Sequence, residues 1–209
     1  MTTRHCSLSA AALMVLVGFL TGLTGCGTEQ PFAVTKKPSG KVDVRQKTAG
    51  TFVSAEDGTS IQRGGALRVG EKSTTGLHFT DGSEMQVRAE SYIELDEGNN
   101  LVKQDSGAVL YNVKPQKDTL RIQTPHGVTA VLGTTFLVEV SSQSTSVALK
   151  EGKIAFTSQA SGEVRELTPG HRLVAPAVGT LPQTLPMSPM ESMDMFSPGE
   201  GVSININRR

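Results

Sequence analysis

The sequence predicts an all-β domain, and three observations support this fold class. Between residues 49 and 175, short runs of β-forming residues alternate apolar and polar side chains, for example around Met85 and Val87, which is the pattern of half-buried strands. Turn pairs that end in glycine, such as Asp81-Gly82, separate these runs, because glycine supplies the positive φ that tight turns need. No stretch of ten or more residues in this region has the spacing of an amphipathic helix.

The spacing of the turns predicts how the strands stack. Turn glycines return at intervals of roughly 20–25 residues, as expected when β layers are coiled or stacked on one another. They are Gly58, Gly82, Gly107, Gly127, Gly152 and Gly170. Hydrophobic residues make up 37% of the chain and aromatic residues 4%, so the core is expected to be thin. We therefore expect a β-solenoid-like or twisted layered β domain, with a closed sandwich as the alternative.

The first element, residues 1–25, has the layout of a secretory signal peptide. Arg4 precedes an apolar run over residues 8–20. This run is shorter than the roughly 20 residues that span a membrane, and polar residues follow it closely, as they do after a cleavable signal. We therefore expect this segment to be a targeting signal that is removed from the mature protein.

The end of this segment resembles a bacterial lipobox. Leu23, Thr24, Gly25 and Cys26 follow the order aliphatic, small, small, cysteine. The resemblance implies cleavage before Cys26, lipid attachment to its thiol and acylation of the new N-terminus, for example with palmitate; several acyl chains make a stable anchor. Because Gly27 and not Asp follows the cysteine, the resemblance also implies an outer-membrane lipoprotein that faces the periplasm, with the cell surface as the alternative.

Residues 26–47 are expected to form a lipidated, flexible tether. The segment contains Pro31, Pro38 and Gly40 and shows neither a helical nor a strand period, which is typical of a spacer. Five of its residues are Lys or Arg, and cations close to a lipid anchor can touch anionic headgroups. A solvated linker is the simpler interpretation.

The chain ends in a Pro/Met-rich tail, residues 176–209, which we expect to be mostly disordered, with a strand at its alternating end around Ile204. Four thioethers, Met187, Met190, Met193 and Met195, lie close together in the tail. Thioethers are soft ligands that suit Cu(I), so a weak cuprous site is one hypothesis. The alternative is an adaptable apolar patch that docks a partner.

Between the tether and the tail, residues 48–175 resemble the FecR domain family. Four segments carry the resemblance in the family's order: residues 76–87, residues 92–95 with 106–109, residues 122–140, and residues 147–156 with 167–171. The third segment, IQTPHGVTAVLGTTFLVEV, is the most specific. It combines a Thr-Pro step, an aliphatic strand, a Gly-Thr-x-Phe element and a second aliphatic strand. The resemblance implies a β-solenoid-like or twisted layered β fold.

The motif residues are interpreted as structural. Pro125 is expected to end a strand at Thr124, because it cannot donate to the ladder. Gly133 permits a bulge or tight crossing, Thr134 can satisfy a local backbone group, and Phe136 is a candidate core anchor. The full set that we carry over from the family is Asp81, Gly82, Pro125, Gly133, Thr134, Phe136, Gly152 and Gly170.

Composition and motifs also bound the function. Lys and Arg equal Asp and Glu at 20 each, which argues against a nucleic-acid partner. The sequence has no HExxH, CxxC, GxSxG or phosphate-loop motif, so we expect no enzyme and no cofactor. His126 is interpreted as a surface loop residue. The oligomeric state stays open.

The FecR resemblance implies recognition of an envelope or periplasmic protein, often as part of a signal relay. The family's iron-uptake regulators have a cytoplasmic anti-sigma region before this domain, and here only a cleavable signal is expected in that place. We therefore expect a non-enzymatic envelope lipoprotein that binds another protein, by a strand edge or a surface. The alternative is a structural envelope component that binds peptidoglycan or glycan.

Overall fold

The computed structural model describes residues 31–98, 100–177 and 181–197, and the prediction of an all-β fold is confirmed. These residues form 17 strands and one short helix. The first nine strands are β1 (Ala33–Ser39), β2 (Val42–Arg45), β3 (Phe52–Ser54), β4 (Ser60–Ile61), β5 (Ala66–Val69), β6 (Thr74–Phe79), β7 (Glu84–Val87), β8 (Tyr92–Leu95) and β9 (Leu101–Asn112). The remaining elements are β10 (Leu120–Thr124), β11 (Gly127–Val131), β12 (Thr135–Val140), β13 (Ser144–Glu151), β14 (Ile154–Ser158), β15 (Val164–Leu167), β16 (His171–Pro176), β17 (Gln183–Pro186) and α1 (Pro189–Met195).

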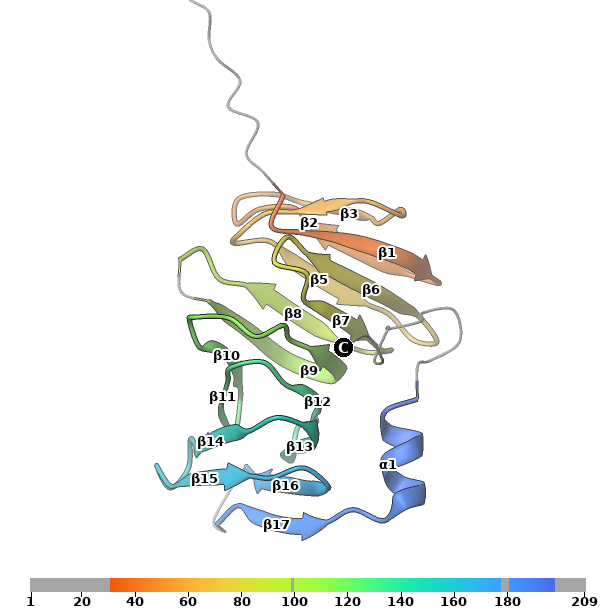
Figure 1. The fold of residues 1–209 in the computed structure, drawn as a ribbon. Helices are drawn as coiled ribbons and strands as arrows, with labels where there is room; N and C mark the ends of the chain where they lie inside the picture. The colour runs from red at the N-terminus through yellow and green to blue at the C-terminus, as the bar shows by residue number, and fades with distance from the viewer. Residues whose placement is uncertain (1–30, 99, 178–180, 198–209) are drawn as a thin grey trace, which may run out of the picture.

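The strands pair into two sheets that share β9 (Figure 1). Sheet A has the order β4-β1-β6-β7-β9-β12-β13-β16-β17. Sheet B has the order β3-β2-β5-β8-β9-β10-β11-β14-β15. The first half of β9 pairs in sheet B and its second half in sheet A. This one long strand therefore joins the two layers.

Hairpins alternate between the two sheets along the chain. After the pair β6–β7 in sheet A, the pairs β10–β11 and β14–β15 extend sheet B, while β12–β13 and β16–β17 extend sheet A. Among the pairings of the described strands, β9–β10 is parallel and the others are antiparallel. The layers are thus twisted and built from hairpins. The pairing does not confirm a solenoid, whose coils would stack through parallel strands.

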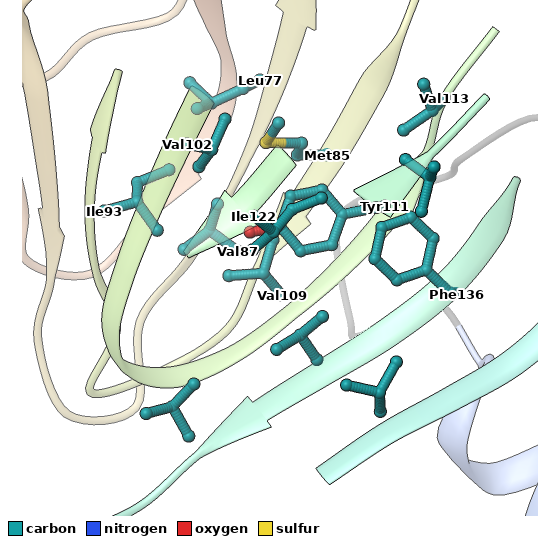
Figure 2. Packing of buried hydrophobic residues seen from close by; sticks show 14 of the residues in the cluster. Leu77, Met85, Val87, Ile93, Val102, Val109, Tyr111, Val113, Ile122 and Phe136 are labelled. Carbon is teal, nitrogen blue, oxygen red and sulfur yellow. The ribbon is translucent and has the colours of Figure 1, made fainter. Parts of the chain in front are cut away.

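The core lies between the sheets (Figure 2). Side chains alternate between this core and the outer faces because successive residues of a strand point to opposite sides. The rings of Tyr111 and Phe136 stack at its centre, with 4.9 Å between centroids and 8° between planes, and both residues are completely buried. The Tyr111 hydroxyl donates to Gln104 Oε1 over 2.9 Å, and Gln104 Nε2 donates to the carbonyls of Gly107 and Val138. These hydrogen bonds satisfy the buried Tyr111 hydroxyl and hold β9 where it passes from sheet B to sheet A.

The expectation of a flexible tether up to residue 47 is wrong for its second half. Residues 33–45 form β1 and β2, which pair with β6 and β5. Buried and half-buried residues alternate along β2 and over the first four residues of β1, and Val42 and Val44 lie in the core. The β domain thus begins at Ala33, within seven residues of Cys26, and not at residue 48. Cys26 itself lies outside the described residues.

The tail is also more ordered than expected. Strand β17 closes sheet A, and α1 packs on the outer face of that sheet, where Phe196 joins Leu110, Leu137 and Ala148 in a second apolar cluster. Ser188 caps the helix by accepting a hydrogen bond from the Glu191 N–H over 3.2 Å. The strand expected around Ile204 lies outside the described residues.

Candidate functional site

A polar and aromatic cluster covers the N-terminal part of the outer face of sheet B. We call it the sheet-B patch. Cross-strand register creates it, because directly paired residues of neighbouring strands point to the same side. Arg45 of β2 pairs with Phe52 of β3 and with Ala66 of β5, which pairs with Glu94 of β8. Two residues along each strand, Asp43, Arg68 and Tyr92 form a parallel row on the same face.

The aromatic rings of the patch are flanked by guanidinium groups. The rings of Phe52 and Tyr92 lie 6.5 Å apart at an angle of 51°. The guanidinium carbon of Arg68 lies 4.7 Å from the centre of the Phe52 ring, and that of Arg45 lies 5.6 Å from it. Both distances are within the range of cation–π attraction. Two arginines therefore lie close to the Phe52 ring on an open sheet face.

Ion pairs fix these arginines. Arg45 Nη2 lies 3.0 Å from Glu94 Oε1, and the Tyr92 hydroxyl donates to the same oxygen over 2.7 Å. Arg68 Nη2 lies 2.9 Å from Asp43 Oδ2. The Arg68 side chain keeps 52% of its surface exposed, compared with 21% for Arg45. Arg68 is thus the member of the patch that most readily meets a partner.

The network perturbs the ionisation of two groups. The hydrogen bond from Tyr92, reinforced by Arg45, lowers the pKa of Glu94 although partial burial opposes this. Partial burial and the bond to Glu94 raise the pKa of Tyr92. Both groups therefore keep their charge states, carboxylate and neutral phenol, over the physiological pH range. Perturbed groups of this kind often gather at functional sites.

The composition of the patch fits protein recognition. Tyr, Phe and Arg are enriched in the centres of protein interfaces, and Tyr and Arg are common among the residues that dominate binding energy. The side chains are already positioned by bonds within the patch, so binding requires little ordering of them. The chemistry is that of a preorganised contact surface.

In the part of the chain that the structure describes, no group of three or more His, Cys, Asp and Glu side chains is placed to hold a metal ion. Nor is any helix of those residues long and apolar enough to cross a membrane. The interpretation of His126 as a surface loop residue is wrong. Its ring is buried, and Nδ1 lies 2.8 Å from Thr145 Oγ1, which donates to Thr124 Oγ1. These contacts connect β13 of sheet A with β10 of sheet B.

Three of the motif residues come together where sheet B passes to sheet A. Gly133 has a φ of 107°, and a Cβ added to it would lie 2.8 Å from the Cα of Pro115. A Cβ added to Gly152 would overlap Thr134 Cγ2 and lie 2.8 Å from the carbonyl oxygen of Gly133. The crossing is therefore possible only without side chains at these two glycines.

Thr134 acts through its backbone in this crossing. Its N–H donates to the Val113 carbonyl and its own carbonyl accepts from the Val113 N–H. Its hydroxyl is buried without a hydrogen-bond partner, so the expected side-chain bond to a backbone group does not form. The backbone groups of Thr134 and Val113 bond to each other instead.

The other motif residues lie apart. Asp81 Oδ1 accepts a bond of 2.7 Å from the Ser83 N–H in the β6–β7 turn, where Gly82 has a φ of 82°. Pro125 is exposed and follows directly after β10, which ends at Thr124. Gly170 has a φ of 79° and stands in open space before β16. Phe136 lies in the core. None of these residues belongs to the sheet-B patch.

The four methionines of the tail divide into two pairs. Met187 and Met195 pack against the apolar cluster under α1. Met190 and Met193 are 76% and 77% exposed. The conformation therefore does not turn all four thioethers to one side, and the cuprous site stays a prediction.

Sequence reasoning missed the sheet-B patch. Arg45 fell within the expected tether, while Phe52, Arg68 and Tyr92 are spread over 41 residues. The signal that could have found them is the run of polar and aromatic residues at outward positions of successive strands, and this requires knowing which strands pair.

Comparison with known proteins supports the fold. Residues 65–155 match the family model described as FecR protein. No curated protein matches the chain. Two crystal structures of a "putative anti-sigma factor" from Parabacteroides distasonis ATCC 8503, at 1.65 and 2.50 Å resolution, share the fold with a TM-score of 0.55 and 16% sequence identity.

The structural match covers 61% of this chain and 62% of the Parabacteroides distasonis chain. At this identity it shows the fold alone. The family match spans β5 to β14 and includes the Gly133–Gly152 crossing. Over residues 65–155 the chain is therefore similar to the FecR family.

Proposed function

We propose that this protein is a non-enzymatic envelope lipoprotein that binds another envelope or periplasmic protein through the sheet-B patch. The observation that carries the proposal is the patch itself, in which Phe52 and Tyr92 lie beside Arg45 and Arg68 on an open sheet face. Such residues are the ones that contribute most to protein interfaces.

Arg68 and Phe52 form the contact point in this proposal. The exposed Arg68 guanidinium offers donors to a carboxylate or carbonyl of the partner. The ion pair with Asp43 holds its orientation. The partner's surface is accordingly expected to present an acidic group next to an apolar one, so that both the guanidinium and the ring are matched.

A signal relay is the form of recognition that we favour. The match to the FecR family model supports it, and the similar Parabacteroides distasonis protein is described as a "putative anti-sigma factor". Relay by this chain requires a partner that carries the signal onward. Its loss is then expected to change transcription in the same way as loss of that partner.

The lipid anchor at Cys26 is part of the proposal. Its support is the order Leu23, Thr24, Gly25, Cys26. Labelling cells with palmitate tests it. Label that is lost in Cys26→Ser supports the anchor, and label that persists in this variant refutes it.

Affinity capture from envelope extracts tests the recognition surface. The bait is the mature chain, compared with Arg68→Ala/Tyr92→Ala. The matched control is Gln123→Ala/Thr157→Ala, which changes two exposed residues on the C-terminal part of the same sheet face. We expect one partner to be captured by the wild type and the control and lost with the patch variant. Equal capture by all three baits would contradict the proposal.

The same bait tests the alternative of a structural glycan-binding component. Aromatic rings can stack on sugars, and Phe52 is one of the half-buried rings. If the wild-type chain sediments with purified sacculi and the patch variant does not, glycan binding replaces protein recognition as the proposed function.

A further inference from the structure

The N-terminal end of the sandwich is strongly basic although the chain as a whole is neutral. Residues 31–73, which carry β1 to β5, contain eight Lys and Arg but four Asp and Glu, so their formal charge is +4. The whole chain sums to zero, so the rest of it carries −4. Strands β1 to β5 lie together at one end of the molecule, drawn at the top of Figure 1. The N-terminal strands therefore carry a net positive charge within a neutral chain.

Most of these cations are free to meet an external anion. Arg45 and Arg68 are paired with carboxylates in the sheet-B patch. Within the described ranges, the other six make no ion pair with a carboxylate. They are Lys36, Lys37, Lys41, Lys47, Arg63 and Lys72. Only three carboxylates of the same segment, Glu56, Asp57 and Glu71, are likewise unpaired.

Two of the free cations line a cavity at this end. The cavity has a volume of about 960 Å³, and Lys47 and Arg63 border it together with Phe32 and the carboxylate residue Glu97. The guanidinium carbon of Arg63 lies 4.0 Å from the centre of the Phe32 ring. Guanidinium and ammonium groups both bind phosphate, and the Phe32 ring offers apolar surface beside Arg63.

The chain enters the fold at this cavity. Pro31, the first described residue, is one of its lining residues. Pro31 follows Cys26 by five positions, and an extended chain covers that spacing in about 17 Å. If Cys26 carries lipid, as the proposed function holds, the basic end lies within that distance of the bilayer. The anchor and the basic end then face the same surface.

We propose that this basic end, centred on Lys47 and Arg63, binds the surface of a bilayer that contains anionic phospholipid. Charge complementarity supports this occupant, since basic residues near an anionic leaflet are attracted to it within a Debye length. The long axis of the sandwich then points away from the membrane. The sheet-B patch stays open on its side.

Vesicle sedimentation tests the proposal without the lipid anchor. The chain from residue 26 onward, with Cys26→Ala, keeps every residue that the structure describes. It is mixed with vesicles of phosphatidylcholine alone, or of phosphatidylcholine and phosphatidylglycerol in equal parts. We expect binding to the mixed vesicles that high salt reverses, and little binding to the neutral ones.

A pair of charge variants locates the surface. Lys47→Gln/Arg63→Gln is expected to weaken binding to the mixed vesicles about 30-fold, because each basic residue at such a surface contributes about a factor of five. Lys117→Gln/Lys153→Gln removes two exposed cations from the rest of the domain and is expected to change binding less than about twofold. Circular dichroism checks that both variants fold.

Equal binding to neutral vesicles, or an equal loss in both variants, would overturn the proposal, as would an absence of binding by the wild-type surface. The result is separable from that of partner capture. The Arg68→Ala/Tyr92→Ala variant leaves Lys47 and Arg63 in place, so it is expected to keep most of its vesicle binding even if it captures no partner.

Discussion

The hydroxyl of Tyr92 donates a 2.7 Å hydrogen bond to Glu94 Oε1 on the outer face of sheet B. The two residues belong to the same strand and lie two positions apart, so their side chains share a face. Arg45 reaches the same carboxylate oxygen from β2. The junction therefore connects the outer surfaces of β2, β5 and β8, because Glu94 of β8 pairs with Ala66 of β5, which pairs with Arg45 of β2.

Replacing Tyr92 by Phe tests this junction. The bond lowers the pKa of Glu94, so Tyr92→Phe is expected to raise that pKa toward its usual value. A carboxyl whose pKa is lower in the folded than in the unfolded protein stabilises the fold at any pH above its unfolded-state pKa. This contribution is lost as the pH falls through the folded-state pKa. The variant is thus expected to lose stability at neutral pH, by about 1 kcal/mol, and little in strong acid. NMR titration of the Glu94 carboxyl measures the shift; an unchanged pKa would refute the junction.

The stacked rings of Tyr111 and Phe136 predict a large stability effect. Phe136 is completely buried, so Phe136→Ala leaves a cavity and is expected to cost about 3–5 kcal/mol. Urea denaturation measures this loss as a lower midpoint. Phe136→Leu keeps more of the volume and serves as the control with a smaller loss. Equal, small losses in both variants would show that this ring is not a core anchor.

The crossing between the sheets predicts that Gly152 does not tolerate a side chain. Gly152→Ala introduces a Cβ into Thr134 at a φ of 96°, whereas the control Gly162→Ala meets nothing within 4 Å at a φ of 68°. Both variants incur the left-handed backbone cost of about 1–2 kcal/mol. Gly152→Ala is expected to lose about 1–3 kcal/mol more through overpacking. Thermal and urea unfolding measure the difference. Equal losses of stability in the two variants would contradict the requirement for glycine at position 152.

Helix α1 is expected to detach from sheet A when Phe196 is removed. Phe196 is the buried residue that places this end of the chain on Leu110 and Leu137, and Arg88 Nη2 adds a hydrogen bond of 2.6 Å to the Met195 carbonyl. In Phe196→Ala, hydrogen exchange is expected to accelerate in α1 while β12 keeps its protection. Met190→Ala, at the exposed side of the helix, is the control. Unchanged exchange in Phe196→Ala would mean that other contacts hold the helix.

The tail thioethers allow a direct test of the cuprous hypothesis. Titration with Cu(I) is expected to show binding that Met190→Leu/Met193→Leu weakens, because these thioethers are accessible and soft. If the chain binds Cu(I) no more tightly than a variant with all four methionines changed to Leu, the hypothesis is wrong.

The fold class is predictable because strand alternation is local. Met85 and Val87 face the core from β7, and the polar residues Glu84 and Gln86 alternate with them along the same strand. The start of the domain is not predictable in this way. Thr35 is buried in β1, yet Lys36 and Lys37 follow it directly, and its hydroxyl donates to the Glu56 carbonyl 21 residues away. Long-range pairing, which no local period reveals, orders this segment.

The sheet-B patch escapes sequence analysis for the same reason. Phe52 and Tyr92 become neighbours because three intervening pairings place β3, β2, β5 and β8 side by side. Each residue alone is an ordinary strand residue. The motif glycines, by contrast, can be recognised individually, because Gly133 and Gly152 are needed for backbone geometry at their own positions.

Photo-crosslinking in living cells tests the central claim most directly. A crosslinking amino acid at Ser54, which is exposed and pairs with Asp43 at the edge of the patch, is compared with one at Thr157 on the C-terminal part of sheet B. The account predicts a protein adduct at Ser54 that disappears when Arg68→Ala is added, and none at Thr157. No protein adduct at Ser54, or the same adduct at both positions, would contradict recognition through the sheet-B patch.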